Sequence, residues 1–166
     1  MKKTILGCFV AGVATISFAA KEPLQEVSQV VELPDLSQKQ IFDSSKIWVA
    51  KTFKSANSVI QYEDSATGTI IGKGNMPYPC SNAWKCLAFS NQIVLFTLKI
   101  DTKDNKARVT FNDLRTKSTQ PSTNTFVKAG QELPIYTDKE GIAEGIKAVI
   151  SEYEVEIRKN QSDADW

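Results

Sequence analysis

The sequence predicts an α+β fold in which a curved antiparallel sheet carries two helices on one face. Three observations predict it. Several segments alternate apolar and polar residues, two others each begin with a capping box and carry an apolar stripe, and one predicted strand has a polar face. The predicted order of elements is β-α-β-β-β-β-α. Because each helix has one apolar stripe and the sheet has one wet face, both helices are expected on the same face of the sheet.

The early part of the chain predicts one strand and one helix. Apolar residues alternate with polar ones over Val27–Leu33, which predicts a strand. The segment Ser37–Gln40 is a capping box, and it opens a helix that should run to about Lys54. Trp48 lies within the apolar stripe of this helix and is expected in the core. Ile47 falls outside the stripe and is expected to be exposed.

Four further segments predict the rest of the sheet. Val59–Glu63 and Thr69–Lys73 are expected to form a hairpin around a turn that ends at Gly68. Gln92–Asp101 is the clearest strand, with Val94, Phe96, Leu98 and Ile100 on one face and Ile93, Leu95, Thr97 and Lys99 on the other. Ala107–Asn112 alternates apolar and polar residues, as an antiparallel strand with one wet face does.

The last part of the chain predicts a long loop and a second helix. Arg115–Gly130 is polar and too long for an ordinary connection, so it is interpreted as a mobile loop, with a functional loop as the alternative. Thr137–Glu140 is a second capping box, and its helix should run to about Arg158. The predicted domain covers residues 20–160, and residues 161–166 are expected to form a disordered tail.

Length and composition exclude several functions without naming one. The 166 residues fit a single domain, and 42% hydrophobic with 23% charged residues is an ordinary globular composition. The formal net charge of +1 gives no argument for nucleic acid or an anionic membrane as partner. The sequence contains no His, which removes His-dependent triads, Cys-His dyads and imidazole metal sites.

Residues 1–19 are interpreted as a secretory signal peptide. Lys2 and Lys3 form a positive start, an uncharged apolar stretch follows, and small residues suit cleavage before Ala20. The apolar run is shorter than the ~20 residues that span a bilayer, so no stable membrane span is expected. A lipoprotein attached at Cys8 is the alternative. The expected location is the periplasm or outside the cell, and removal of the two lysines lowers the formal net charge from +1 to −1.

Export changes the interpretation of the remaining cysteines. Cys80 and Cys86 form an even pair with five residues between them, in a stretch where Pro, Ser and Asn favour a turn. In an oxidising compartment such a pair predicts a disulfide. A redox-active pair usually has Cys-x-x-Cys spacing at a helix start, and a metal site needs further ligands. The sequence therefore predicts a structural disulfide, with no metal and no cofactor.

Aromatic residues surround this small loop. Tyr78, Trp84 and Phe89 are the candidate binding residues, because such side chains offer large contact area at low cost in conformational entropy. In the alternative interpretation Trp84 and Phe89 simply cover the end of the sheet.

Four segments carry packing and turn motifs of a recognisable kind: Ser37–Phe42, Trp48–Phe53, Val59–Asp64 and Gly68–Gly74. Together they resemble a bacterial exported family of unknown function with a TBP-like fold, most densely over residues 30–115. The resemblance implies the β-α-β-β-β-β-α fold and supplies no catalytic residues. The disulfide loop is outside the shared pattern. A TBP-like fold does not imply DNA binding, and a mature charge near −1 argues against it.

These observations favour a non-catalytic exported domain that binds a protein or an envelope component. Carboxylates are dispersed along the chain, and neither G-x-S-x-G nor S-x-x-K is present, so no catalytic residue is assigned. The alternative is a carrier of a small apolar ligand, held in a cavity between the sheet and a helix.

Overall fold

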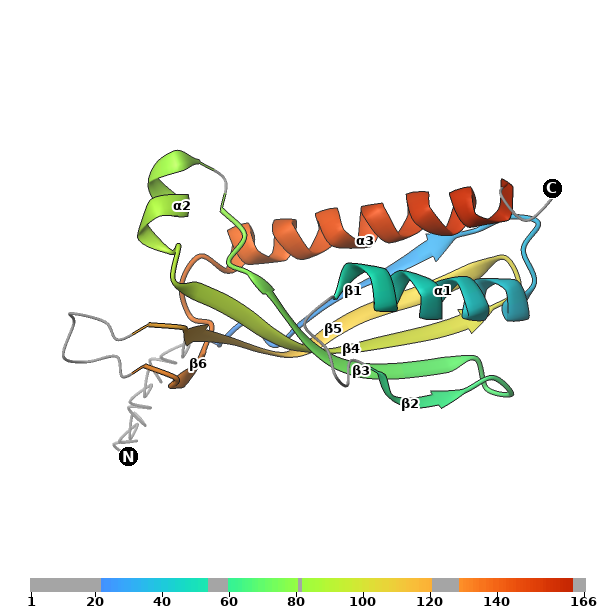
Figure 1. Cartoon of the computed structure of the whole chain (residues 1–166), viewed down its shortest axis with the longest axis horizontal. Coiled ribbons are helices and arrows are strands. Elements are labelled where there is room, and N and C mark those ends of the chain that lie inside the picture. Colours follow the sequence, from blue (N-terminus) through green and yellow to red (C-terminus); the bar gives the residue numbers. More distant parts are fainter. Residues whose placement is uncertain (1–21, 54–59, 81, 121–128, 163–166) are drawn as a thin grey trace, which may run out of the picture.

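The structure is a computed structural model that describes residues 22–53, 60–80, 82–120 and 129–162. The predicted signal peptide lies outside these residues, as do most of the predicted tail and the predicted helix end at Lys54. The described elements follow the order β1-α1-β2-β3-α2-β4-β5-β6-α3 (Figure 1).

The strands form one antiparallel sheet. Its strands within the described residues are β1 (Glu26–Glu32), β2 (Ile60–Asp64), β3 (Thr69–Pro77), β4 (Gln92–Lys103), β5 (Lys106–Ser118) and β6 (Glu132–Pro134). They lie in the order β1-β5-β4-β3-β2, and β6 pairs with the last part of β5. The turn between β2 and β3 ends at Gly68, whose φ of 69° suits glycine, as predicted.

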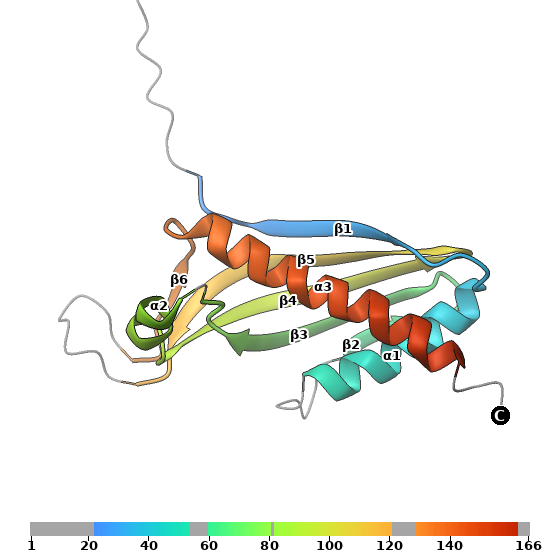
Figure 2. The same cartoon turned by 90° about the horizontal axis from the view of Figure 1, so that it is seen from above.

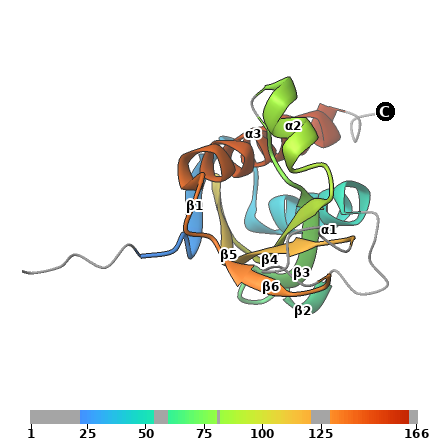
Figure 3. The ribbon, with the colours of Figure 1, turned by 90° about the vertical axis from the view of Figure 1, so that its left-hand side faces the viewer.

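Two long helices cover one face of the sheet and leave the other face open, which confirms the predicted architecture. They are α1 (Gln38–Thr52) and α3 (Lys139–Ser162), and Figures 2 and 3 show both on the same side. The predicted capping box is present: the Ser37 side chain accepts from the Gln40 backbone N–H, and Gln40 Oε1 accepts from the Ser37 backbone N–H at 3.0 Å. Ile47 is exposed, as expected.

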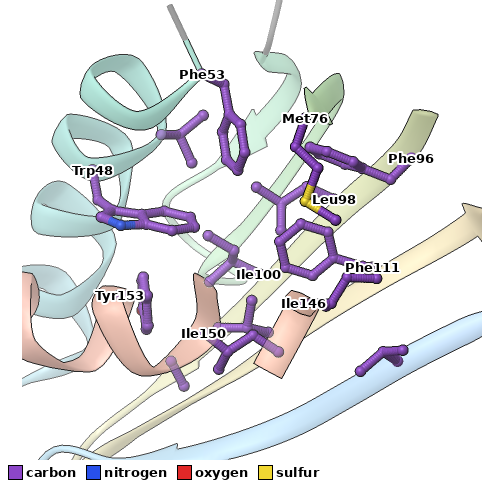
Figure 4. Packing of buried hydrophobic residues seen from close by; sticks show 14 of the residues in the cluster. Trp48, Phe53, Met76, Phe96, Leu98, Ile100, Phe111, Ile146, Ile150 and Tyr153 are labelled. Atoms are coloured by element: carbon purple, nitrogen blue, oxygen red, sulfur yellow. The ribbon is translucent and has the colours of Figure 1, made fainter. Parts of the chain in front are cut away.

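The core lies between these helices and the sheet, and it is dense with aromatic rings (Figure 4). Trp48 is buried as predicted, and its ring meets that of Tyr153 edge-on with centroids 5.0 Å apart. Phe96 contacts Phe53 and Phe111 at centroid distances of 5.2 and 4.8 Å.

The structure corrects two strand boundaries. β3 continues to Pro77, four residues beyond the predicted end. β5 continues through Ser118, and Arg115 to Lys117 pair with β6, a strand that the sequence did not predict. The prediction of a loop over Arg115–Gly130 is therefore wrong for Arg115 to Ser118, because these residues continue β5 and backbone pairing with β6 keeps Arg115 to Lys117 in the sheet. Residues 121–128 lie outside the described residues.

The ends of α3 also differ from the prediction. The helix begins at Lys139, and the Asp138 carbonyl accepts the hydrogen bond from the Ile142 N–H at 3.0 Å. Asp138 rather than Thr137 therefore occupies the cap position, with a φ of 52°. The helix ends at Ser162 rather than near Arg158.

Candidate binding surface

A short helix, α2 (Ala83–Ala88), begins inside the loop closed by the cysteines, where the sequence predicted only a turn, and ends two residues beyond Cys86. The predicted disulfide is present: Cys80 and Cys86 are bonded, with their Cα atoms 5.1 Å apart. Asn82 caps the helix, because its Oδ1 accepts from the Lys85 backbone N–H at 2.9 Å. A helix of six residues is marginal by itself in water, so contacts with the rest of the fold must hold it.

An aromatic stack, a hydrogen bond and an ion pair join α2 and its flanking residues to the rest of the domain. The rings of Tyr78 and Phe89 stack with centroids 4.3 Å apart. The Tyr78 hydroxyl donates to Asp138 Oδ2 at 3.2 Å, and Lys85 Nζ binds Asp138 Oδ1 at 2.8 Å. Burial raises the pKa of Tyr78 to about 12, and the neighbouring Asp138 carboxylate adds to the effect. One carboxylate at the start of α3 thus fixes both flanks of the loop.

Close backbone packing adds a further constraint. Pro79 lies against Gly145 of α3 so tightly that a Cβ added at Gly145 would sit 2.2 Å from the Pro79 Cβ. Only glycine fits at this point of the helix without movement of the loop. The loop therefore contacts α3 along its first turns as well as at its cap.

The outward side of α2 is apolar and exposed. Trp84 has 82% of its surface exposed and Leu87 has 69%. The two residues are three positions apart, so they lie on the same face of the helix. Ala83 and Ala88 are also exposed, and the only charged residue of α2, Lys85, is bound to Asp138. The helix presents an uncharged face, which we call the Trp84–Leu87 face.

The predicted candidate residues therefore divide into two groups. Tyr78 is buried and stacks on Phe89, which packs against the core, whereas Trp84 is exposed and is not among the residues packed on the core. Sequence reasoning missed Leu87 and Asp138. The spacing of Leu87 from Trp84 was a usable signal once a helix was assumed, but nothing local to Asp138 marks its contacts with residues 53 and 60 positions away.

A recess of about 670 Å³ lies away from α2, where β1 and β6 meet the middle of β5. Arg115 lines it and is paired with Asp113 at 2.8 Å and with Glu132 at 3.6 Å. Asp113 has a φ of 53° in the stretch of β5 where its register with β4 shifts. The lining thus has one arginine and three carboxylates, Glu26, Asp113 and Glu132, and two of these carboxylates are paired with Arg115.

Other kinds of site find no support in the part of the chain that the structure describes. Those residues include no group of three or more metal-binding side chains that could hold an ion. Among the same residues, no helix is long and apolar enough to cross a membrane. The disulfide is typical of an oxidising compartment.

The sheet, the two helices on its one face and the disulfide-held helix at its end define an α+β sheet-and-helix domain with one projecting apolar surface. The chain belongs to the family described as "Domain of unknown function (DUF4468) with TBP-like fold", whose model matches residues 28–117, more than half of the chain. This agrees with the resemblance drawn from the sequence, and no role is assigned to the family by that description.

Two solved structures share the fold. A DUF4468 family protein from Bacteroides ovatus has a TM-score of 0.61 and 16% identity, covering 86% of this chain and 91% of that one. A TBP-like protein from Parabacteroides distasonis has a TM-score of 0.61 and 13% identity, covering 80% of this chain and 92% of that one. At these identities the likeness shows the fold alone. A comparison with curated proteins gave no match.

Proposed function

We propose that this protein is a non-catalytic exported domain that binds another protein by inserting the Trp84–Leu87 face into an apolar pocket of that partner. The exposure of Trp84 on a short helix that a disulfide restrains carries the proposal. Large exposed aromatic side chains on rigid elements dominate the energy of many interfaces. Export is supported by the charged and apolar N-terminal sequence and by the disulfide.

The rigidity of α2 supports a binding role over an incidental exposure. The disulfide, the Tyr78–Phe89 stack, the bonds to Asp138 and the contact of Pro79 with Gly145 all restrain the segment that carries the helix. A surface that is already ordered loses less conformational entropy on binding. Four constraints thus hold the helix that exposes the side chains of Trp84 and Leu87 to solvent.

The charge around the Trp84–Leu87 face favours a protein over a membrane as its binding partner. Helices that bind anionic lipid surfaces carry Lys or Arg around their apolar face. The only lysine of α2, Lys85, is bound inward to Asp138 at 2.8 Å, and its other residues are uncharged. An uncharged face with one Trp and one Leu fits an apolar pocket of a protein better than an anionic surface.

Site-specific crosslinking in cells that export the protein tests this proposal. A photoreactive phenylalanine analogue at position 84 should capture a specific partner, and the same analogue at Val155, an apolar side chain of α3 that is 66% exposed, should not. With the purified partner, Trp84→Ala should weaken binding by about 30-fold, the size of a hot-spot loss of about 2 kcal/mol. The matched control Val155→Ala should stay within twofold.

Three results would overturn the proposal. Trp84→Ala could bind the captured partner as tightly as the native protein. Sedimentation could show a dimer that depends on Trp84, which would make a second copy the occupant. Neutral or anionic vesicles could bind the protein through Trp84 with no protein partner involved.

A further inference from the structure

The open face of the sheet carries a cationic cluster at the turn between β4 and β5. Lys103 and Lys106 lie directly opposite each other in the register of these strands. The next pair on the same face of the sheet is Asp101 and Arg108, and Lys99 follows on that face of β4. Figure 1 places this turn at the opposite end of the sheet from α2, so it is separate from the Trp84–Leu87 face.

The single carboxylate in this cluster is already shared. Asp101 Oδ1 lies 2.8 Å from Lys99 Nζ, and Asp101 Oδ2 lies 3.1 Å from Arg108 Nη2. Burial raises the pKa of Asp101, but hydrogen bonds from Lys99 and Arg108 outweigh it and hold the pKa below its ordinary value. Asp101 is therefore ionised at neutral pH and is occupied by two cations.

Lys103 and Lys106 are not ion-paired in the part of the chain that the structure describes. Among the described residues neither makes an ion pair within 4.0 Å, although Glu32 on β1 lies opposite Lys106. The neighbouring Asp104 uses its Oδ1 to accept from the Gln38 backbone N–H at 2.8 Å. Like charges directly opposite each other across two strands destabilise a sheet. An anion placed between the two ammonium groups would remove that repulsion.

The surface between these cations is hollowed. A recess of about 220 Å³ is lined by Val30, Asp101, Lys103, Lys106, Ala107 and Arg108. Val30, 52% exposed, adds an apolar side chain to the recess. Lysine binds phosphate as a compact charge with three rotatable donors, and a phosphate ester near neutral pH carries a charge of about −1.5 to −2. We propose that this recess binds the phosphate group of a phosphorylated ligand between Lys103 and Lys106, with Val30 beside the carbon that bears the phosphate.

Titration with pyrophosphate and inorganic phosphate tests the proposal directly. At constant ionic strength, pyrophosphate should raise the melting temperature, and amide resonances of the residues that line the recess should shift. Lys103→Gln and Lys106→Gln should each weaken the binding at least tenfold. Without anion, Lys103→Gln should melt at a higher temperature than the native protein, because the repulsion is gone, whereas Lys106→Gln also loses the attraction to Glu32 on β1 and should gain less.

Lys73→Gln is the matched control. Lys73 lies on β3, opposite Thr97 of β4, and lines a different recess, so this variant removes the same charge elsewhere in the sheet. It should change neither the binding nor the melting temperature without anion. If sulfate has the same effect as pyrophosphate, or Lys73→Gln the same effect as Lys106→Gln, the ions act by general screening and the proposal fails.

Vesicles distinguish the two sources of the phosphate. Binding to phosphatidylglycerol vesicles that depends on Lys106, without binding to phosphatidylcholine, would assign the recess to a lipid headgroup. A response to free pyrophosphate alone would assign it to a soluble ligand. If neither vesicles nor pyrophosphate at millimolar concentration bind in a Lys106-dependent way, the proposal is refuted.

Discussion

Replacing Gly145 by alanine would reveal how firmly the disulfide loop is held against α3. The added Cβ would lie 2.2 Å from Pro79 Cβ and 2.7 Å from Pro79 Cγ. Non-bonded carbon atoms lie about 3.5–4.0 Å apart, so the loop must retreat by roughly 1.5 Å or the helix must tilt. Such overpacking costs about 1–3 kcal/mol, whereas alanine is favoured over glycine in a helix by up to about 1 kcal/mol. We expect Gly145→Ala to destabilise the protein by about 0–2 kcal/mol.

Two further variants separate the steric overlap with Pro79 from the intrinsic preference of a helix for alanine over glycine. Ala148→Gly, at an exposed position of the same helix, measures the intrinsic difference between the two residues without any overlap and should lower the melting temperature. Pro79→Gly removes the atoms that the new Cβ would meet, because the Pro79 Cα is 3.7 Å away. In that background Gly145→Ala should raise the melting temperature by roughly 2–4 °C for each kcal/mol gained.

Thermal unfolding followed by circular dichroism supplies these temperatures, and the rate at which dithiothreitol reduces the disulfide reports on the loop itself. Gly145→Ala should speed the reduction if the loop is displaced. The reasoning is refuted if Gly145→Ala raises the melting temperature equally with proline and with glycine at position 79.

Three further outcomes are expected. Burial raises the pKa of Tyr153 from its ordinary 10.0 to about 12. The unfolded chain therefore ionises first, and the stability that is present below pH 10 is lost as the pH rises toward 12. Between pH 9 and 11 the denaturation midpoint should fall less steeply for Tyr153→Phe than for the native protein. Gly68→Ala, with a φ of 69° and a neighbouring carbonyl 2.6 Å from the new Cβ, should cost about 1–3 kcal/mol in urea unfolding. Gly130→Ala, with a φ of 78° and open space around it, should cost less, and equal costs would contradict the steric argument. Replacing Cys80 and Cys86 by serine should cost roughly 2 kcal/mol and reduce the near-ultraviolet dichroism of the aromatic stack, whereas an unchanged spectrum would show that the disulfide does not hold α2.

Most of the fold could be predicted because its signals are local. The capping box at Ser37 needs only residues three positions apart, and it is present as expected. The alternation along β4 reports burial on one face, and Leu98 and Ile100 are indeed fully buried. The missed strand β6 has three residues, too few for a periodic pattern, and its place in the sheet depends on pairing with β5.

The candidate surface could be predicted only in part, because it depends on contacts between distant residues. The sequence placed Tyr78, Trp84 and Phe89 in one aromatic loop but could not say which of them faces outward. Which side chain is exposed depends on Asp138, at the start of α3, which binds both Lys85 and Tyr78. A six-residue helix with little intrinsic stability takes its orientation from such partners rather than from its own sequence.

The two proposed sites can be tested independently because β4 separates them along its length. Gln92, at the start of β4, accepts a backbone hydrogen bond from Tyr78 beside α2, and Lys103 ends the same strand at the cationic turn. Twelve residues at about 3.3 Å each place the two ends roughly 35–40 Å apart. Sites at that distance without shared partners normally contribute additively. The double variant Trp84→Ala, Lys106→Gln should therefore show the sum of the two single effects on stability, and each site should keep its own binding when the other is removed. A protein partner and a phosphorylated ligand would then occupy opposite ends of one sheet, and binding of either would leave the affinity for the other unchanged.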